Sequence, residues 1–213
     1  MKWTLTNNSS SGGAPEIERA LEVVGALLGE VGPPIELVII GGAALNILGF
    51  VSRPTKDVDV LGVRVSSGGI GIAKADPLPP ELAAAAAQAA LDLGLDAGWL
   101  NAGPADLLDW GLPEGFESRL IPRRYGPRLL VYLPGRVDLI SLKVYAAADA
   151  GVGRHTEDLR ALNATCDELL GGATWARSHD PSSGFCGMLC TLLRYFGCVA
   201  AAEALEHECS ASD

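Results

Sequence analysis

The sequence predicts a mixed α/β (α+β) fold with a helical C-terminal part. Short apolar runs typical of strands alternate with helical patterns through the first two thirds of the 213-residue chain, and only helical patterns follow. Apolar residues make up 48% of the chain and charged residues 20%, which is typical of a globular protein. We expect a disordered N-terminus over residues 1–14, a core over 15–137, and a helical part over 138–209 that packs on the core.

The N-terminal part of the core alternates between the periodicities of helices and strands. The first helix carries apolar residues on one face, and Gly32, Pro33 and Pro34 end it. The next segment is a continuous apolar run, which favours a strand that is buried on both faces. In order, we expect a helix over 15–28, a strand over 36–40, a helix over 43–48, a strand over 56–61 and a turn over 66–69.

The rest of the chain is mainly helical. Alanine content predicts one helix, and Thr165 and Glu168 have the spacing of a capping box at the start of another. One further apolar run predicts a strand. We expect helices over 81–93, 104–110, 138–149, 156–162, 167–175 and 184–208, the last with a break near Gly197, and a strand over 129–133.

The segment from residue 37 to residue 61 contains the residues that could form a functional site. Gly41 and Gly42 stand between a predicted strand and a predicted helix, where they let a ligand approach the backbone and present amide groups to it. Asp57 and Asp59 are two apart on the next predicted strand, so they project from one face with Cα atoms roughly 7 Å apart. Two neighbouring carboxylates repel each other, and this face therefore favours a cation.

Mg²⁺ is the cation that this pattern favours, because it prefers oxygen ligands and is usually held by one or two carboxylates together with substrate phosphates. A triphosphate suits the glycine pair. The two features together predict a site for Mg²⁺ and a nucleoside triphosphate, with Asp57 and Asp59 as the metal ligands. Each feature alone has an ordinary structural explanation, since alternating acids occur on many surface strands and paired glycines occur in tight turns.

The ordered combination of these features resembles the signature of minimal nucleotidyltransferases in the DNA polymerase β superfamily. In particular it resembles the AbiEii-like branch, which includes toxins of type IV toxin–antitoxin systems. The resemblance rests on the glycine pair followed by Gly49, Arg53, Thr55 and the two aspartates. It continues through the motifs at 99–101, 112–115, 138–143 and 158–162.

This resemblance implies a polymerase β-type core, a small mixed sheet flanked by helices, and roles for individual residues. It implies catalytic roles for Asp57, Asp59, Lys143 and Asp158, and nucleotide contacts for Gly41, Gly42, Arg53 and Thr55. Two of these roles have structural alternatives. A helix lysine such as Lys143 can extend its charged end into solvent, and Asp158 can be an acid favoured by the helix dipole in a first turn.

Two positions depart from the pattern that the resemblance implies. Many members of the superfamily carry a third carboxylate on a later strand, but the run at 129–133 has none. Asp138, just after it, is the nearest acid, and we expect it to cap a helix. Ala150 stands where related sequences often carry arginine.

The implied reaction transfers a nucleoside monophosphate from NTP to a hydroxyl group and releases pyrophosphate. The acceptor is open: a tRNA 3′ end, a protein or a small molecule, and an antitoxin is the partner that the toxin relatives imply. A formal charge of −10 disfavours a large RNA, so RNA would have to meet the local basic cluster. This cluster comprises Arg119, Arg123, Arg124 and Arg128, and Arg136 and Lys143 follow it. Its structural alternative is an ordinary solvated loop. The alternatives are a catalytically silent interaction module and an aminoglycoside-type nucleotidyltransferase.

The sequence predicts a cytoplasmic protein without a membrane segment. The chain has no apolar stretch long enough to cross a bilayer, and its start is polar rather than basic and then apolar. The cysteines are odd in number and form no CxxC pair. We therefore expect reduced thiols, with a metal cluster of Cys186, Cys190, His207 and Cys209 as the less favoured alternative.

Overall fold

The structure, a computed structural model, describes residues 13–65 and 71–210. It has the mixed α+β architecture that the sequence predicts. Residues 1–12 of the expected disordered N-terminus, and the turn expected over 66–69, lie outside the described residues. The described chain divides into two compact units, one formed by residues up to 106 with 122–133, the other by 107–121 with 134–210.

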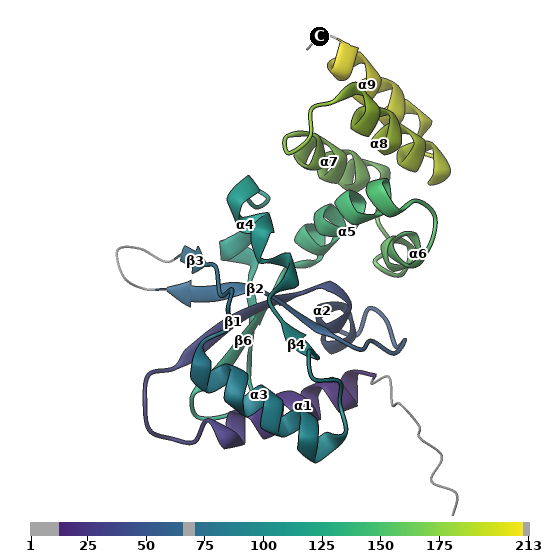
Figure 1. Ribbon diagram of the computed structural model, residues 1–213. Coiled ribbons are helices and arrows are strands. Elements are labelled where there is room, and N and C mark those ends of the chain that lie inside the picture. Colours follow the sequence, from purple (N-terminus) through teal and green to yellow (C-terminus); the bar gives the residue numbers. More distant parts are fainter. Residues whose placement is uncertain (1–12, 66–70, 211–213) are drawn as a thin grey trace, which may run out of the picture. The chain divides into compact units, whose positions relative to one another are not determined.

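The first unit is built on a mixed sheet (Figure 1). The strands lie in the order β3-β2-β1-β6-β5, and β4 pairs with β2. β1 runs antiparallel to β2 and parallel to β6, while β4 runs parallel to β2. The strands are β1 (Ile35–Ile40), β2 (Val58–Val65), β3 (Gly71–Ala73), β4 (Leu100–Asn101), β5 (Ile121–Arg124) and β6 (Leu129–Leu133).

Helices complete the core of this unit. They are α1 (Ala14–Leu27), α2 (Gly41–Ile47) and α3 (Pro80–Leu93), and a 3-10 turn, η1, spans Gly103–Asp106. α1 packs beside α3, and α2 packs against β1 and β2. Leu37 and Ile39 of β1 and Val131 of β6 are completely buried, as expected for strands that are apolar on both faces.

The predicted strands at 36–40, 56–61 and 129–133 are confirmed as β1, β2 and β6, with the bounds of β1 and β2 corrected. β2 begins at Val58, so Asp57 precedes the strand instead of lying on it. The reason is the pairing with β4, since the first hydrogen bond runs from Val58 N–H to the Trp99 carbonyl at 2.5 Å. The expected helix at 43–48 is α2, which begins earlier, at Gly41.

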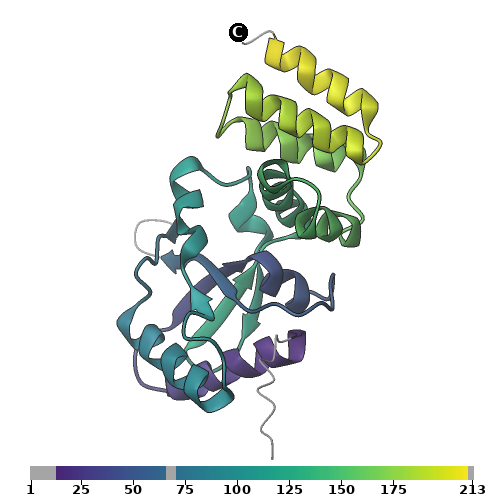
Figure 2. The ribbon, with the colours of Figure 1, turned by 45° about the vertical axis from the view of Figure 1, so that its right-hand side comes forward.

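The second unit is helical. Its helices are α4 (Leu107–Trp110), η2 (Phe116–Arg119, a 3-10 turn), α5 (Arg136–Ala150), α6 (Arg154–Ala161), α7 (Cys166–Arg177), α8 (Ser183–Tyr195) and α9 (Val199–Ser210). α5 packs against α6, α7 and α8, and α9 packs against α7 and α8 (Figure 2). Across both units, the described helices are too short or too polar to pass through a bilayer.

Two local signals in the second unit act as the sequence predicts. Thr165 Oγ1 accepts a hydrogen bond from Glu168 N–H, and Glu168 Oε2 accepts one from Thr165 N–H, which is the predicted capping box at the start of α7. Gly197 has a φ of +78° and separates α8 from α9 at the predicted break. The helix expected over 104–110 is instead divided into η1 and α4.

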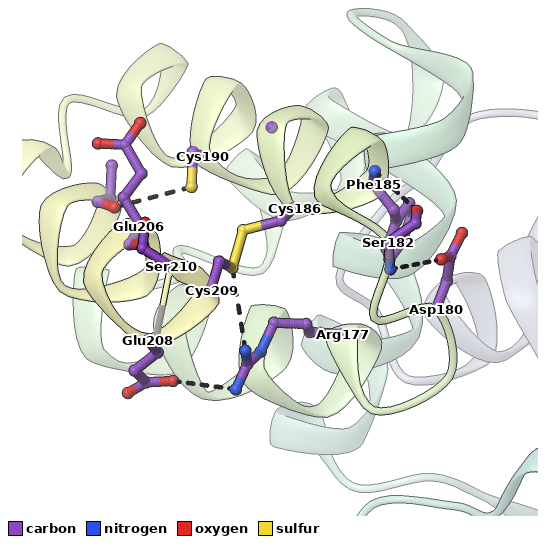
Figure 3. The surroundings of a disulfide bond; sticks show 12 residues. Arg177, Asp180, Ser182, Phe185, Cys186, Cys190, Glu206, Glu208, Cys209 and Ser210 are labelled. Atoms are coloured by element: carbon purple, nitrogen blue, oxygen red, sulfur yellow. Dashed lines mark hydrogen bonds and ion pairs between the residues drawn. A yellow bond between two sulfur atoms is a disulfide. The ribbon is translucent and has the colours of Figure 1, made fainter. Parts of the chain in front are cut away.

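The expectation of reduced thiols is wrong for four of the five cysteines. One disulfide joins Cys166 at the start of α7 to Cys198, which lies between α8 and α9. The other joins Cys186 of α8 to Cys209 of α9 (Figure 3), so these two thiols cannot form the metal cluster considered above. Cys190 is a buried free thiol whose Sγ donates to the Ala202 carbonyl at 3.7 Å.

Candidate active site

The glycine pair and Asp59 come together where β1 meets α2. β1 and β2 are antiparallel, and their register pairs Asp59 with Ile40, the residue before Gly41. Gly41 has a φ of +73°, and a Cβ placed on it would overlap the carboxylate oxygen Oδ2 of Asp59. Glycine is therefore required at position 41 both by the backbone and by the space that the Asp59 carboxylate occupies.

Gly42 is covered by two of the predicted nucleotide-binding residues. The Thr55 hydroxyl lies 3.0 Å, and an Arg53 guanidinium nitrogen 3.7 Å, from where a Cβ of residue 42 would stand. Thr55 is buried, and its hydroxyl donates to the Asp57 carbonyl at 3.5 Å. The segment between α2 and β2 thus folds back over Gly42 and brings a cation, Arg53, beside it.

Asn46 holds the backbone at Gly42, a role that the sequence did not indicate. Its Nδ2 donates to the Gly42 carbonyl at 2.9 Å, while its Oδ1 is buried without a partner among the described residues. The side chain is only 2% exposed. The sequence feature that could have indicated this role is the single asparagine among the apolar residues of α2, because a buried polar side chain needs a hydrogen-bond partner.

The two aspartates contribute two carboxylates that differ in exposure. Asp57 is exposed, Asp59 is half-buried, and the buried Val58 stands between them. Within the described ranges, no group of three or more His, Cys, Asp or Glu side chains is placed to hold a metal. Two carboxylates alone suit Mg²⁺, which takes its remaining oxygen ligands from water or phosphate, better than a metal that requires a closed protein cage.

Asp138 does not take the capping role that the sequence predicts. It lies in the first turn of α5, whose N-cap is Gly135, and its carboxylate is completely buried. Arg119 holds it with two hydrogen bonds, Nε to Oδ2 at 2.9 Å and Nη2 to Oδ1 at 2.6 Å. The hydrogen bond to Asp138 raises the pKa of Arg119 above its ordinary value. Asp138 is therefore one half of an internal ion pair.

Lys143 and Asp158 meet in the second unit as a buried ion pair. Lys143 Nζ on α5 lies 2.7 Å from Asp158 Oδ2 on α6, and the residues are 5% and 0% exposed. The burial of Lys143 excludes a lysine that extends into solvent. α6 begins at Arg154, so Asp158 lies beyond the first turn and the dipole explanation does not apply either.

Arg119 and Arg128 of the predicted basic cluster, and Arg136 after it, form internal ion pairs. Besides Arg119, Arg128 is buried and binds Glu81 at 2.8 Å, and Arg136 binds Glu168. The hydrogen bond from Arg136 lowers the pKa of Glu168 to about 2. Arg123 and Arg124 lie exposed on β5.

Comparison with known proteins identifies the family. The model of a family described as "Nucleotidyltransferase of unknown function (DUF6036)" matches residues 19–161, a range that contains every residue discussed above as a candidate for catalysis or nucleotide binding. Neither the curated proteins nor the solved structures gave a match. Because the family model covers more than half of the chain, the protein belongs to this nucleotidyltransferase family.

Proposed function

We propose that the protein is a Mg²⁺-dependent nucleotidyltransferase that moves a nucleoside monophosphate from NTP to a hydroxyl acceptor. The observation that carries the proposal is the contact of the Asp59 carboxylate with Gly41, next to Gly42 under Thr55 and Arg53. An acidic group, two side-chain-free backbone positions and a guanidinium group are thereby gathered at one corner of the sheet. These are the parts needed to hold a metal-bound triphosphate.

In this proposal each group has a defined task. The backbone at Gly41 and Gly42 and the cation of Arg53 would bind phosphate oxygens, and the carboxylates of Asp57 and Asp59 would hold Mg²⁺. The bound ion would neutralise charge on the phosphate oxygens. The acceptor oxygen forms a bond to the α-phosphorus as the bond to the bridging oxygen breaks. Pyrophosphate leaves, and the acceptor proton passes to water.

Lys143 and Asp158 enter the proposal as a pair. The resemblance to AbiEii-like enzymes implies that Lys143 contacts the triphosphate, where a fixed positive charge stabilises the leaving pyrophosphate. The 2.7 Å contact with Asp158 holds the ammonium group in a single position and neutralises its charge while the pair is intact. It also means that a change to either residue acts on the other.

The acceptor that we favour is a small molecule or a protein rather than a folded RNA. The formal charge is −10, and Arg119, Arg128 and Arg136 are engaged with carboxylates of the chain itself. A cationic small acceptor of the aminoglycoside type suits this charge. A tRNA 3′ end, and with it an antitoxin partner, would follow from the toxin relatives of the AbiEii-like branch.

The proposal is tested by following label from NTP. The purified protein is incubated with Mg²⁺, each α-labelled NTP in turn, and a cell extract, and the label is then located in RNA, protein or small molecules. We expect transfer that requires Mg²⁺ and is abolished in Asp57→Ala and Asp59→Ala, because either change removes a metal ligand. Asp96→Ala, at an exposed acid of the same unit, serves as the control and should keep full activity.

A second pair of variants tests the geometry at Gly41. Gly41→Ala and Gly49→Ala both place a Cβ at a positive φ, +73° and +77°, but only the first Cβ meets the Asp59 carboxylate. Each should lose about 1–2 kcal/mol of stability from backbone strain. Only Gly41→Ala should lose transfer activity. Equal activity in the two variants, or label transfer by Asp59→Ala, would overturn the proposed site.

A further inference from the structure

We propose that Asn101 binds a phosphate oxygen of the nucleotide through its side-chain amide. The inference rests on the proposed function and adds a substrate-binding residue to the site. β4 consists of only Leu100 and Asn101 and lies beside β2 (Figure 1). The two strands are parallel, and their register places Asn101 opposite Asp59. Residues in register on paired strands project from the same face, about 4.8 Å apart. Asp59 therefore has Ile40 and the glycine pair on one side and Asn101 on the other.

The loop around Asn101 fixes the orientation of its amide group. Asn101 Oδ1 accepts a hydrogen bond from Gly103 N–H at 2.9 Å, and a Cβ on Gly103 would lie 3.0 Å from this oxygen. Asn101 Nδ2 donates to the Gly98 carbonyl at 3.4 Å, a long hydrogen bond. The oxygen is thus committed to the chain, while the amide nitrogen has two N–H bonds and uses one of them weakly.

This orientation suits a phosphate better than a metal ion. A metal would take the amide oxygen, one lone pair of which accepts from Gly103 N–H, whereas an anionic oxygen needs an N–H donor, and the amide nitrogen has one N–H left for it. The side chain beside Asp59 on its β4 side is therefore a neutral donor and not a third acid. A phosphate oxygen placed between a carboxylate-bound cation and this amide would be bound from both sides.

The substitution Asn101→Asp separates nucleotide binding from loop capping. Aspartate keeps the size of the side chain and an oxygen that accepts from Gly103 N–H, but it replaces the N–H donor with a negative charge. Asn101→Ala removes both interactions. We expect Asn101→Asp to weaken binding of Mg²⁺ with a non-hydrolysable NTP analogue at least ten-fold, as loss of a hydrogen bond to a charged group does. The Tm should fall only slightly, because the Gly103 N–H keeps its acceptor and the bond lost to Gly98 is long. Asn101→Ala should weaken binding similarly and also lower the Tm.

Calorimetric titration with the analogues of ATP, GTP, CTP and UTP decides between the outcomes. If the wild type binds one of them and Asn101→Asp binds it equally well, the amide only caps the loop and the inference is wrong while the proposed function stands. If the wild type binds none of the four, the proposed function fails, and the inference fails with it. Asp59→Ala, which should bind none, shows that the measured affinity belongs to this site.

Discussion

Two groups of charged residues that the sequence connects to one reaction lie in opposite environments. Asp57 and Asp59, in the first unit, carry charges of the same sign, one exposed and the other half-buried. Lys143 and Asp158, in the second unit, carry opposite charges 2.7 Å apart and are almost completely buried. The first pair gains from an added cation, because like charges close together repel. The second pair is already neutral as a unit.

The two pairs differ in what balances their charges. Asp57 and Asp59 would need a bound cation, whereas Lys143 and Asp158 balance each other once the chain has folded. A Mg²⁺ ion with phosphate oxygens can relieve the repulsion between Asp57 and Asp59, and both side chains have access to solvent. For Lys143 and Asp158, folding itself supplies the partner, and removal of either leaves a buried charge. Substitutions should therefore affect binding in the first region and stability in the second.

The largest expected effect on stability is at Lys143. Lys143→Met keeps most of the packing but leaves the Asp158 charge buried, which should lower the free energy of unfolding by about 3–5 kcal/mol. The double variant Lys143→Met/Asp158→Asn removes both charges and should recover most of this loss. Urea denaturation followed by circular dichroism measures both. As a control, Arg194→Met breaks a half-exposed ion pair with Glu206 and should change stability little.

The double variant also separates structure from catalysis. If Lys143 contributes to transfer as proposed, the stable double variant should transfer nucleotide at least ten-fold more slowly than the wild type. Full activity in the double variant would make the ion pair purely structural and confine catalysis to the first unit. Unchanged stability of Lys143→Met would contradict the buried ion pair itself.

The next largest expected effect comes from the two disulfides. Both lie in the second unit, so their reduction should affect that unit and not the first. The disulfides close loops with sequence separations of 32 and 23 residues. Chain-entropy arguments give roughly 3–4 kcal/mol of stability for each bond of this length. We expect reduction to speed hydrogen exchange in α7, α8 and α9 and to leave β1 and β2 unchanged.

A thiol titration provides the matching control. Under denaturing conditions without reductant, one thiol per chain should react, because Cys190 is the free cysteine. Cys190→Ala should then titrate with none and keep the stability difference between oxidised and reduced protein. Five reactive thiols in the unreduced wild type, or equal hydrogen exchange before and after reduction, would contradict the cross-links.

The elements that could be predicted from the sequence are those with a strong local pattern. β1 and β6 are continuous apolar runs, and the start of α7 has both members of its capping box. β4 could not be predicted, because two residues form a strand only through their pairing with β2. The disulfides could not be predicted either, since their pairing depends on how the last helices pack.

The candidate site divides in the same way. Gly41 and Asp59 could be selected because each belongs to a short motif in one segment of chain. Asn101 is far from Asp59 in sequence and becomes its neighbour only in the sheet. The contact between Lys143 and Asp158 also depends on tertiary structure, because it forms between two helices. Local patterns thus identify residue types, and packing decides which residues meet.

The smallest expected effect is on the pH dependence of stability and arises at Glu168, a charged group of the second unit that is neither fully buried nor open. Arg136 holds the pKa of Glu168 at about 2, below its ordinary value of 4.5. The unfolded chain therefore binds a proton before the folded chain does as the pH falls, and stability is lost between pH 4.5 and about 2. Because the pair is partly exposed, solvent screening limits the loss of stability to about 1 kcal/mol.

The variant Glu168→Gln has no titrating group at this position. Its free energy of unfolding should therefore fall by about 1 kcal/mol less than that of the wild type over the same pH interval. The comparison of denaturation midpoints at pH 5 and pH 2.5 removes the contribution of the other carboxylates, since these titrate in both proteins. Parallel decreases in the two proteins would mean that the Arg136 contact does not form in solution.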